Sequence, residues 1–186
     1  ALSLNALAKG YIVERAAQSA FGVNGIEGVM LEIGGDLRVL GSSEQKVSIT
    51  DPQHDSEGEL PLGWCALKNA AAATSGGYRR GFVVGDKTLS HLLDPRTGLP
   101  AAANTPLSVT VVAPDAMTAD ALATIGSLLP VAESLERIAG LPGCGIFVAD
   151  SDGRYAQGGV LTLWSDSKGR RKVETQDVVW TTGAAG

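Results

Sequence analysis

The chain has 186 residues, enough for one hydrophobic core without the disulfides that a mini-domain needs. A net charge of −5, an aromatic content of 5% and scattered basic residues argue against DNA or RNA as a partner. No apolar run reaches the length of a membrane span. The two cysteines lack metal-type or redox-type spacing, so free buried thiols are expected, with a disulfide as the alternative.

The expected organisation is a single domain over residues 1–186. No signal peptide precedes Ala1, and the absence of a starting methionine suggests a processed product or a piece of something longer. Strands and helices alternate without regular βαβ units, which predicts the α+β class with a mixed or antiparallel sheet and helices packed on it.

The first expected element is a helix over Ser3–Phe21, capped by Ser3 or Asn5. We expect its buried stripe to consist of Leu4, Leu7, Ala8, Tyr11, Ile12, Ala16 and Ala20. Gly10 inside this helix costs about 1 kcal/mol against Ala, which indicates a close approach of another element. Lys9 is either a solvent-facing helix lysine or a cation beside a phosphate.

Apolar runs and turn signals predict the remaining elements. Strands are expected at Val29–Ile33, Leu37–Leu40, Lys46–Thr50, Trp64–Ala73, Gly81–Val84, Leu89–Leu93, Leu107–Val112 and Gly145–Val148, with a terminal pair at Val160–Trp164 and Lys172–Glu174. Helices are expected at Ala116–Leu129, capped by Asp115 or Thr118, and at Val131–Ile138.

Two stretches of the chain are candidates for binding a ligand. Gly34-Gly35-Asp36 is typical of a hairpin turn, and the alternative is that both glycines let a ligand approach the backbone. Ala73–Pro100 combines glycines, arginines and His91 with an Asp-Pro-Arg-Thr-Gly turn, and we interpret it as a nucleotide-handling loop. His91 is expected at a strand end facing a cleft, unless it is hydrogen-bonded within the sheet.

Asp120 and Thr124 lie four residues apart and therefore share one helical face. A carboxylate and a hydroxyl are hard oxygen donors that suit Mg²⁺, whose remaining ligands are usually waters and substrate phosphates. The alternative is that Asp120 solvates the first turns of the helix and Thr124 is packed.

Five motifs resemble, in sequence and order, the ApbE-type FAD:protein FMN transferases. They are Ala8-Lys9-Gly10-Tyr11, Glu32-Ile33-Gly34-Gly35-Asp36, Ser75-Gly76-Gly77-Tyr78-Arg79-Arg80, His91-Leu92-Leu93-Asp94-Pro95-Arg96-Thr97-Gly98 and Asp115-Ala116-Met117-Thr118-Ala119-Asp120-Ala121-Leu122-Ala123-Thr124. The last two are the most specific, and the Gly-Gly-Asp turn alone is weak.

The resemblance implies a T-fold-like domain that binds FAD and Mg²⁺, cleaves FAD at its pyrophosphate, releases AMP and passes FMN to a threonine of an acceptor flavoprotein. It implies Asp120, Thr124 and the Ala8 carbonyl as metal ligands and His91 beside the reacting phosphate. The cofactor-binding residues that it implies are Lys9, Tyr11, Gly34, Gly35, Asp36, Ser75, Gly76, Tyr78, Leu92 and Leu93. The implied location is the bacterial periplasm or the outer face of the inner membrane.

Two departures bear on this resemblance. The family usually has Asp at the position of Ser3 and a glycine pair at Asn5-Ala6, and a longer segment precedes its Ala-Lys-Gly helix. The chain is therefore expected to correspond to the C-terminal, larger part of a flavin transferase. The alternatives are an FAD pyrophosphatase, a flavin- or partner-binding module without turnover, and a structural domain.

Overall fold

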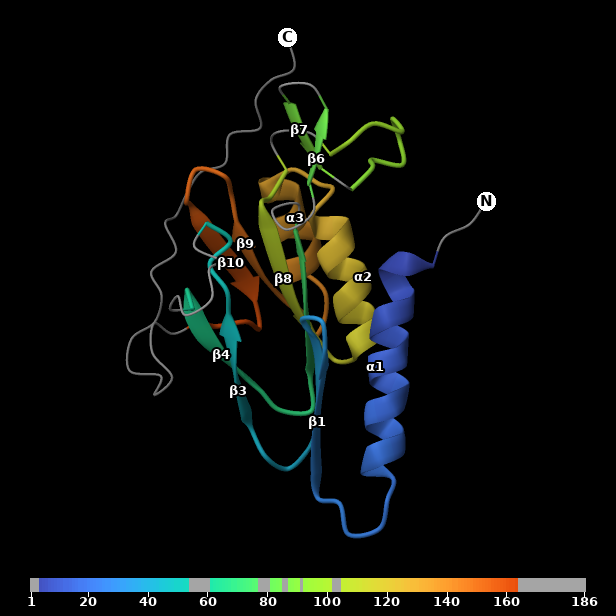
Figure 1. Cartoon of the computed structure of the whole chain (residues 1–186). Helices are drawn as coiled ribbons and strands as arrows, with labels where there is room; N and C mark the ends of the chain where they lie inside the picture. The colour runs from blue at the N-terminus through green and yellow to red at the C-terminus, as the bar shows by residue number, and fades with distance from the viewer. Residues whose placement is uncertain are drawn as a thin grey trace.

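A computed structural model describes residues 4–53, 61–76, 81–84, 87–90, 92–101 and 105–163. Its main feature is a six-stranded sheet of order β1-β2-β5-β8-β9-β10, in which every neighbouring pair is antiparallel (Figure 1). The strands are β1 Gly28–Ile33, β2 Asp36–Gly41, β3 Gln45–Ile49, β4 Gly63–Leu67, β5 Ala71–Gly76, β6 Gly81–Val84, β7 Lys87–Ser90, β8 Ser108–Ala113, β9 Gly145–Ala149 and β10 Tyr155–Gly159. The helices are α1 Asn5–Phe21, α2 Ala116–Gly126 and α3 Val131–Ala139. The predicted α+β class is confirmed.

The sheet is covered on both faces, which explains why β8 and β9 are buried along their whole length and rich in apolar residues. The helices pack on one face, and the β3–β4 hairpin lies against the other (Figure 1). Alternation along each strand divides the side chains between the two cores: Val111 contacts the helical side and Val112 the hairpin side. All of β8 is buried, as its nearly apolar sequence predicts, and its two polar residues, Ser108 and Thr110, are buried with it.

Helix α1 buries a different face from the one expected. Gly10, Val13, Glu14 and Ala17 lie against the rest of the protein, whereas the predicted apolar stripe is exposed. The exposed members of that stripe are Leu4, Leu7, Ala8, Tyr11, Ile12, Ala16 and Ala20. The prediction was wrong because α1 approaches α2 too closely for large side chains at the contact. The predicted cap is also absent from the described residues: Leu4 occupies the N-cap and makes no side-chain hydrogen bond.

The strand expected over Trp64–Ala73 is two strands in two different layers. The chain turns at Asn69, whose φ of 47° is left-handed and whose side chain accepts a hydrogen bond from the Gly41 amide at 2.8 Å. Strand β4 therefore pairs with β3 across the hairpin, and β5 enters the main sheet between β2 and β8. The apolar pattern continues through the turn and does not reveal it.

Other boundaries shift by a few residues. Strand β7 covers Lys87–Ser90, so it begins and ends earlier than the predicted Leu89–Leu93 strand, and Leu93 makes an isolated bridge to Pro100. Helix α2 ends at Gly126 instead of Leu129 because Ser127 forms its C-cap.

The C-terminal strand of the sheet lies earlier in the chain than expected. The predicted strand over Val160–Trp164 is wrong in its described part, since β10 forms instead from Tyr155–Gly159. Trp164 and Lys172–Glu174 lie outside the described residues. Both cysteines are buried free thiols. No helix in the described ranges is long and apolar enough to cross a membrane.

Candidate functional site

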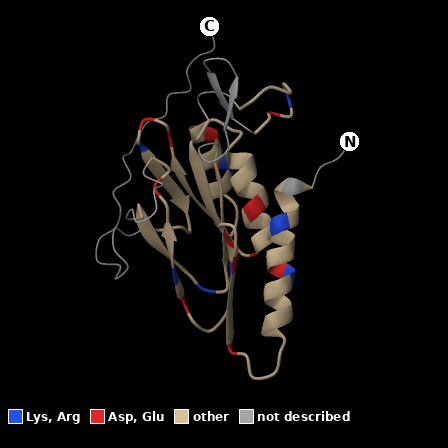
Figure 2. Ribbon diagram, viewed as in Figure 1, with Lys and Arg blue, Asp and Glu red and all other residues tan. Residues whose placement is uncertain are grey.

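The site is built where α1 crosses α2. Gly10 provides the close approach, because a Cβ at this position would collide with the Ala116 carbonyl and lie 2.8 Å from Cβ of Asp120. The Gly10 amide donates a hydrogen bond to Oδ2 of Asp120 at 2.9 Å. In Figure 2 the acidic segment of α2 accordingly lies beside the basic segment of α1. The absence of a side chain at Gly10 is thus what brings the two helices, and their motifs, together.

Asp120 and Thr124 lie on the face of α2 that is directed at α1 and β5. Asp120 is buried, and its Oδ1 has no hydrogen-bond donor among the described residues. The Thr124 hydroxyl lies 3.3 Å from Oγ of Ser75, at the end of β5. The structure therefore brings Ser75, Thr124 and Asp120 to one place from positions far apart in the sequence. Gly76 ends the same strand beside them.

Lys9 and Asp36 form an ion pair beside this group. Nζ of Lys9 lies 2.8 Å from Oδ1 of Asp36 and donates to the Gly34 carbonyl at 3.2 Å. Asp36 is buried, and neither of its oxygens accepts a well-directed hydrogen bond from the described residues. Burial raises the pKa of the Asp36 carboxyl to about 6; Lys9 opposes this shift, and the nearby Asp120 and Glu32 add to it.

The Gly-Gly-Asp segment is the hairpin turn that its sequence predicts. Ile33 pairs with Asp36, and Gly34 and Gly35 have φ of 58° and 88°, the values of a type I′ turn. The Gly35 amide donates to Oε1 of Glu32 at 2.9 Å, which supports the turn from within β1. The turn also directs the Gly34 carbonyl at Lys9, so the same residues form the hairpin and bind the lysine of the site.

The structure does not bring Tyr11 to this cluster. Tyr11 lies on the outer face of α1 and is 54% exposed, whereas Lys9 and Gly10 are directed inwards. Ala8 also lies within α1, in its first turns.

The loop after β7 is closed by its own side chains. Asp94 accepts hydrogen bonds from the Arg96 amide and guanidinium, which lower the pKa of its carboxyl. Leu92 and Leu93 lie at the base of this loop, where the Ala101 amide donates to the Leu92 carbonyl. Arg96 is thereby neutralised within the loop. His91 and Tyr78 lie outside the described residues, so their expected roles stay predictions.

Sequence reasoning missed the buried Glu14–Arg38 ion pair. Oε2 of Glu14 lies 2.9 Å from Nε of Arg38 and accepts a hydrogen bond from the Ala116 amide. The sequence does hold a signal for this pair. Glu14 lies four residues after Gly10 and therefore on the same face of the helix, and a glycine within a helix indicates that this face contacts another element.

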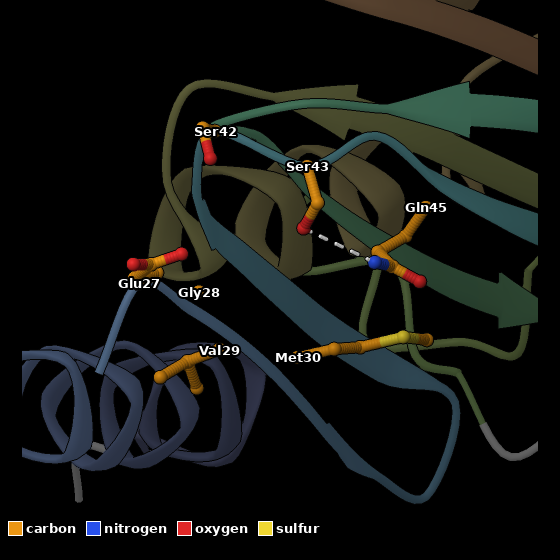
Figure 3. Close-up of a pocket in the computed structure, with 7 residues that line it drawn as sticks. All are labelled: Glu27, Gly28, Val29, Met30, Ser42, Ser43 and Gln45. Carbon is orange, nitrogen blue, oxygen red and sulfur yellow. Dashed lines mark hydrogen bonds between the residues drawn. The ribbon is translucent and has the colours of Figure 1, made fainter. Parts of the chain in front are cut away.

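A hollow of about 300 Å³ lies at the other end of β1 from the Gly34-Gly35 turn. Figure 3 shows its lining, in which Met30 and Gln45 face each other and Nε2 of Gln45 donates to Oγ of Ser43 at 3.3 Å. Among the described residues that line it, Glu27 alone is charged. With no convergent charges, this hollow lacks the chemistry found at the α1–α2 crossing.

The oxygens at the α1–α2 crossing fit a hard divalent cation. Asp120 offers a carboxylate oxygen without a donor, and Thr124 offers a hydroxyl on the same helical face. Within the described ranges, no three His, Cys, Asp or Glu side chains gather as a metal cage. Such a site suits Mg²⁺, which keeps waters and takes phosphate oxygens from a ligand.

The sequence profile of the ApbE family matches residues 1–147. The chain belongs to the ApbE family. It is 35% identical over 129 residues to the FAD:protein FMN transferase of Haemophilus influenzae, covering 66% of this chain and 36% of that protein. Residues 1–147, which match the family profile, include Lys9, Asp36 and Asp120, so the family match covers the structural site.

Solved structures of ApbE proteins share the fold. The ApbE protein of Thermotoga maritima has a TM-score of 0.73 at 32% identity, over 84% of this chain and 51% of that one. The flavin transferase ApbE of Vibrio cholerae has a TM-score of 0.61 at 29% identity, over 84% of this chain and 49% of its own. This ApbE chain thus spans about half of these structures and little more than a third of the Haemophilus protein.

Proposed function

We propose that this chain is the FAD- and Mg²⁺-binding part of an FAD:protein FMN transferase. The reaction cleaves FAD at its pyrophosphate and joins FMN to a threonine of an acceptor flavoprotein, with release of AMP. The observation that carries the proposal is the convergence of Lys9, Asp36, Asp120 and Thr124 at one helix crossing, within the family's motifs. We place the protein, as part of the same proposal, in the bacterial periplasm or on the outer face of the inner membrane.

The roles follow from charge and position. Asp120 and Thr124 would hold Mg²⁺, with the backbone carbonyl of Ala8 as a third ligand. A bound Mg²⁺ neutralises charge on the pyrophosphate. Lys9 supplies a positive charge to the same phosphates, and Ser75 and Gly76 line the flavin side of the site.

His91 is proposed as the group that accepts the proton of the acceptor hydroxyl. Histidine exchanges a proton near neutral pH, whereas Asn of similar size does not. We expect His91→Asn to lower the rate of transfer by roughly 10²-fold or more, with FAD affinity changed much less. Equal losses of rate and affinity would make His91 a binding residue instead.

The test of the proposed function uses Asp120→Asn. Asn keeps an oxygen that accepts the Gly10 amide, so the helix crossing is preserved, but it loses the charge that holds the cation. We expect AMP release from FAD in the presence of Mg²⁺, measured by chromatography, to fall by roughly 10²-fold or more.

Asp152→Asn is the matched control, because Asp152 is exposed in a turn far from α2 in sequence and its carboxylate pairs with Arg154. This variant should keep full activity. AMP release that continues unchanged in Asp120→Asn would contradict the proposal. AMP release without attachment of FMN to an acceptor protein would indicate a pyrophosphatase.

A further inference from the structure

Asp36 belongs to the group of charged residues at the α1–α2 crossing, but its carboxylate is buried and out of reach of a ligand. Its side chain is 1% exposed, while that of Lys9 is 39% exposed. The two residues therefore differ in what they can touch: a nucleotide phosphate can reach the Lys9 ammonium but cannot reach the Asp36 carboxylate without displacing Lys9 or the hairpin turn.

The geometry of Lys9 shows what Asp36 does. An ammonium group has three N–H donors. One is donated to the Gly34 carbonyl, 3.2 Å away, and Oδ1 of Asp36 lies 2.8 Å from the same nitrogen as its ion-pair partner. Both groups belong to the same β1–β2 hairpin, so the hairpin holds the ammonium from one side and leaves its other side open to solvent or a ligand.

Asp36 also differs from a carboxylate that serves only local structure. Asp150 is nearly as buried, but its oxygens accept hydrogen bonds from the Asp152 amide and from the Arg154 amide and guanidinium. Asp36 has only the ion pair with Lys9 to offset its burial among the described residues.

Two observations make the position of Asp36 separable from the fold of the turn. The Gly35 amide is held by Glu32, and the glycines alone provide the type I′ geometry. The charged groups that act on Asp36 come from three elements: Lys9 on α1, Glu32 on β1 and Asp120 on α2. A neutral Asn at position 36 should therefore leave the turn intact while removing the charge that attracts Lys9.

We propose that Asp36 is a positioning residue that contacts no ligand and acts solely by holding Lys9 against the Gly34 carbonyl, so that the free N–H of Lys9 is presented to a phosphate oxygen. The inference rests on the proposed function for the identity of the ligand, a pyrophosphate-containing nucleotide. It replaces the sequence-based expectation that Asp36 binds the cofactor directly. It also gives the Gly-Gly-Asp motif two tasks, forming the hairpin and fixing a cation.

A double-mutant cycle tests the proposal. FAD affinity is measured by isothermal titration calorimetry in the presence of Mg²⁺ for the wild type, Asp36→Asn, Lys9→Met and the double variant. We expect Asp36→Asn to weaken binding about tenfold, the scale of one charge-assisted hydrogen bond. In the Lys9→Met background, Asp36→Asn should leave FAD affinity almost unchanged, because the lysine through which Asp36 acts is absent.

If the fold-losses in FAD affinity of the two single variants multiplied in the double variant, the proposal would be overturned, because Asp36 would then contact the ligand independently of Lys9. Glu133→Gln removes the same charge from an exposed pair on α3 and should leave the affinity unchanged. Lys9→Gln replaces Lys9→Met if the latter does not fold.

A second measurement needs no ligand. The ¹⁵Nζ signal of the Lys9 ammonium, followed by NMR at low temperature, should be visible in the wild type and lost by fast exchange in Asp36→Asn. An unchanged signal in Asp36→Asn would overturn the proposal whatever the affinity for FAD. If the wild-type chain bound no FAD and the Lys9 signal were still lost in Asp36→Asn, the result would contradict the proposed function but support the role of Asp36 in holding Lys9.

Discussion

At the scale of single residues, Gly10 decides how closely α1 and α2 approach. Any Cβ there meets the Ala116 backbone, which cannot move aside as the end of a flexible side chain could. Its amide also donates a hydrogen bond to Asp120. One missing side chain therefore controls both the packing of the helices and the position of the proposed metal ligand.

Gly10→Ala should destabilise the protein in spite of the higher helix propensity of alanine. We expect a loss of about 1–3 kcal/mol in the free energy of unfolding, the usual cost of overpacking, measured by urea denaturation. Gly22→Ala is the control, since a Cβ at Gly22 meets no atom closer than 3.5 Å and its φ is ordinary. Equal stability of the Gly10→Ala variant and the wild type would show that the crossing relaxes freely.

Asp36 predicts a pH dependence of stability. Its pKa is raised from 3.8 to about 6, so the native state binds the proton more tightly than the unfolded state does. The contribution of Asp36 is therefore fully present below pH 4 and is lost as the pH rises to about 6, by at most roughly 3 kcal/mol.

The measurement is the difference in unfolding free energy between the wild type and Asp36→Asn from pH 4 to pH 7. The wild type should lose stability relative to the variant as the pH rises. A difference that is constant over this range would show that Asp36 titrates normally.

At the scale of elements, Glu14 ties three of them together. Its carboxylate accepts hydrogen bonds from the Ala116 amide at the start of α2 and from Gln18 one turn along α1, and it pairs with Arg38 on β2. The ion pair is almost completely removed from water. Charge at this point is therefore what aligns α1 with both the sheet and α2.

Glu14→Gln should be strongly destabilising, because it leaves the Arg38 guanidinium buried without a counter-charge. We expect a loss of about 3–5 kcal/mol, as for other buried pairs from which one partner is removed. Glu133→Gln in the exposed Glu133–Arg137 pair should cost no more than about 1 kcal/mol. Thermal and urea unfolding of both variants measure the contrast, and similar losses in both would refute the role given to Glu14.

At the scale of the whole molecule, the core reaches α1 on one side only. Val13 enters the helical core and Ala17 is fully buried, while Leu4, Tyr11 and Ile12 remain exposed on the opposite face. Helix α1 is thus apolar on two faces, of which one is buried against the sheet and α2 and the other is exposed.

Neighbouring positions on α1 should therefore respond in opposite ways. Val13→Ala removes fully buried methyl groups and should cost roughly 2–3 kcal/mol. Ile12→Ala, at an exposed position, should change the free energy of unfolding by no more than about 0.5 kcal/mol. If urea denaturation found Ile12→Ala to be the more damaging variant, the outer face of α1 would be part of the stabilising core.

The sequence alone determines the features that depend on neighbours along the chain. Three predicted features form: the Gly34-Gly35 turn, the Asp115 cap that accepts a hydrogen bond from the Thr118 amide, and the buried, nearly apolar strand β8. The shared face of Asp120 and Thr124 follows from helical spacing alone. Local hydrogen bonds and backbone preferences decide each of these, so no distant partner is needed.

Only the tertiary structure decides the features that depend on distant partners. Asp120 meets the Gly10 amide across 110 positions, and Lys9 meets the Asp36 carboxylate from another element. The buried face of α1 and the turn at Asn69 were mispredicted for the same reason. An apolar stripe shows that a face can be buried, but the steric fit at Gly10 and the ion pair of Glu14 select which face is buried.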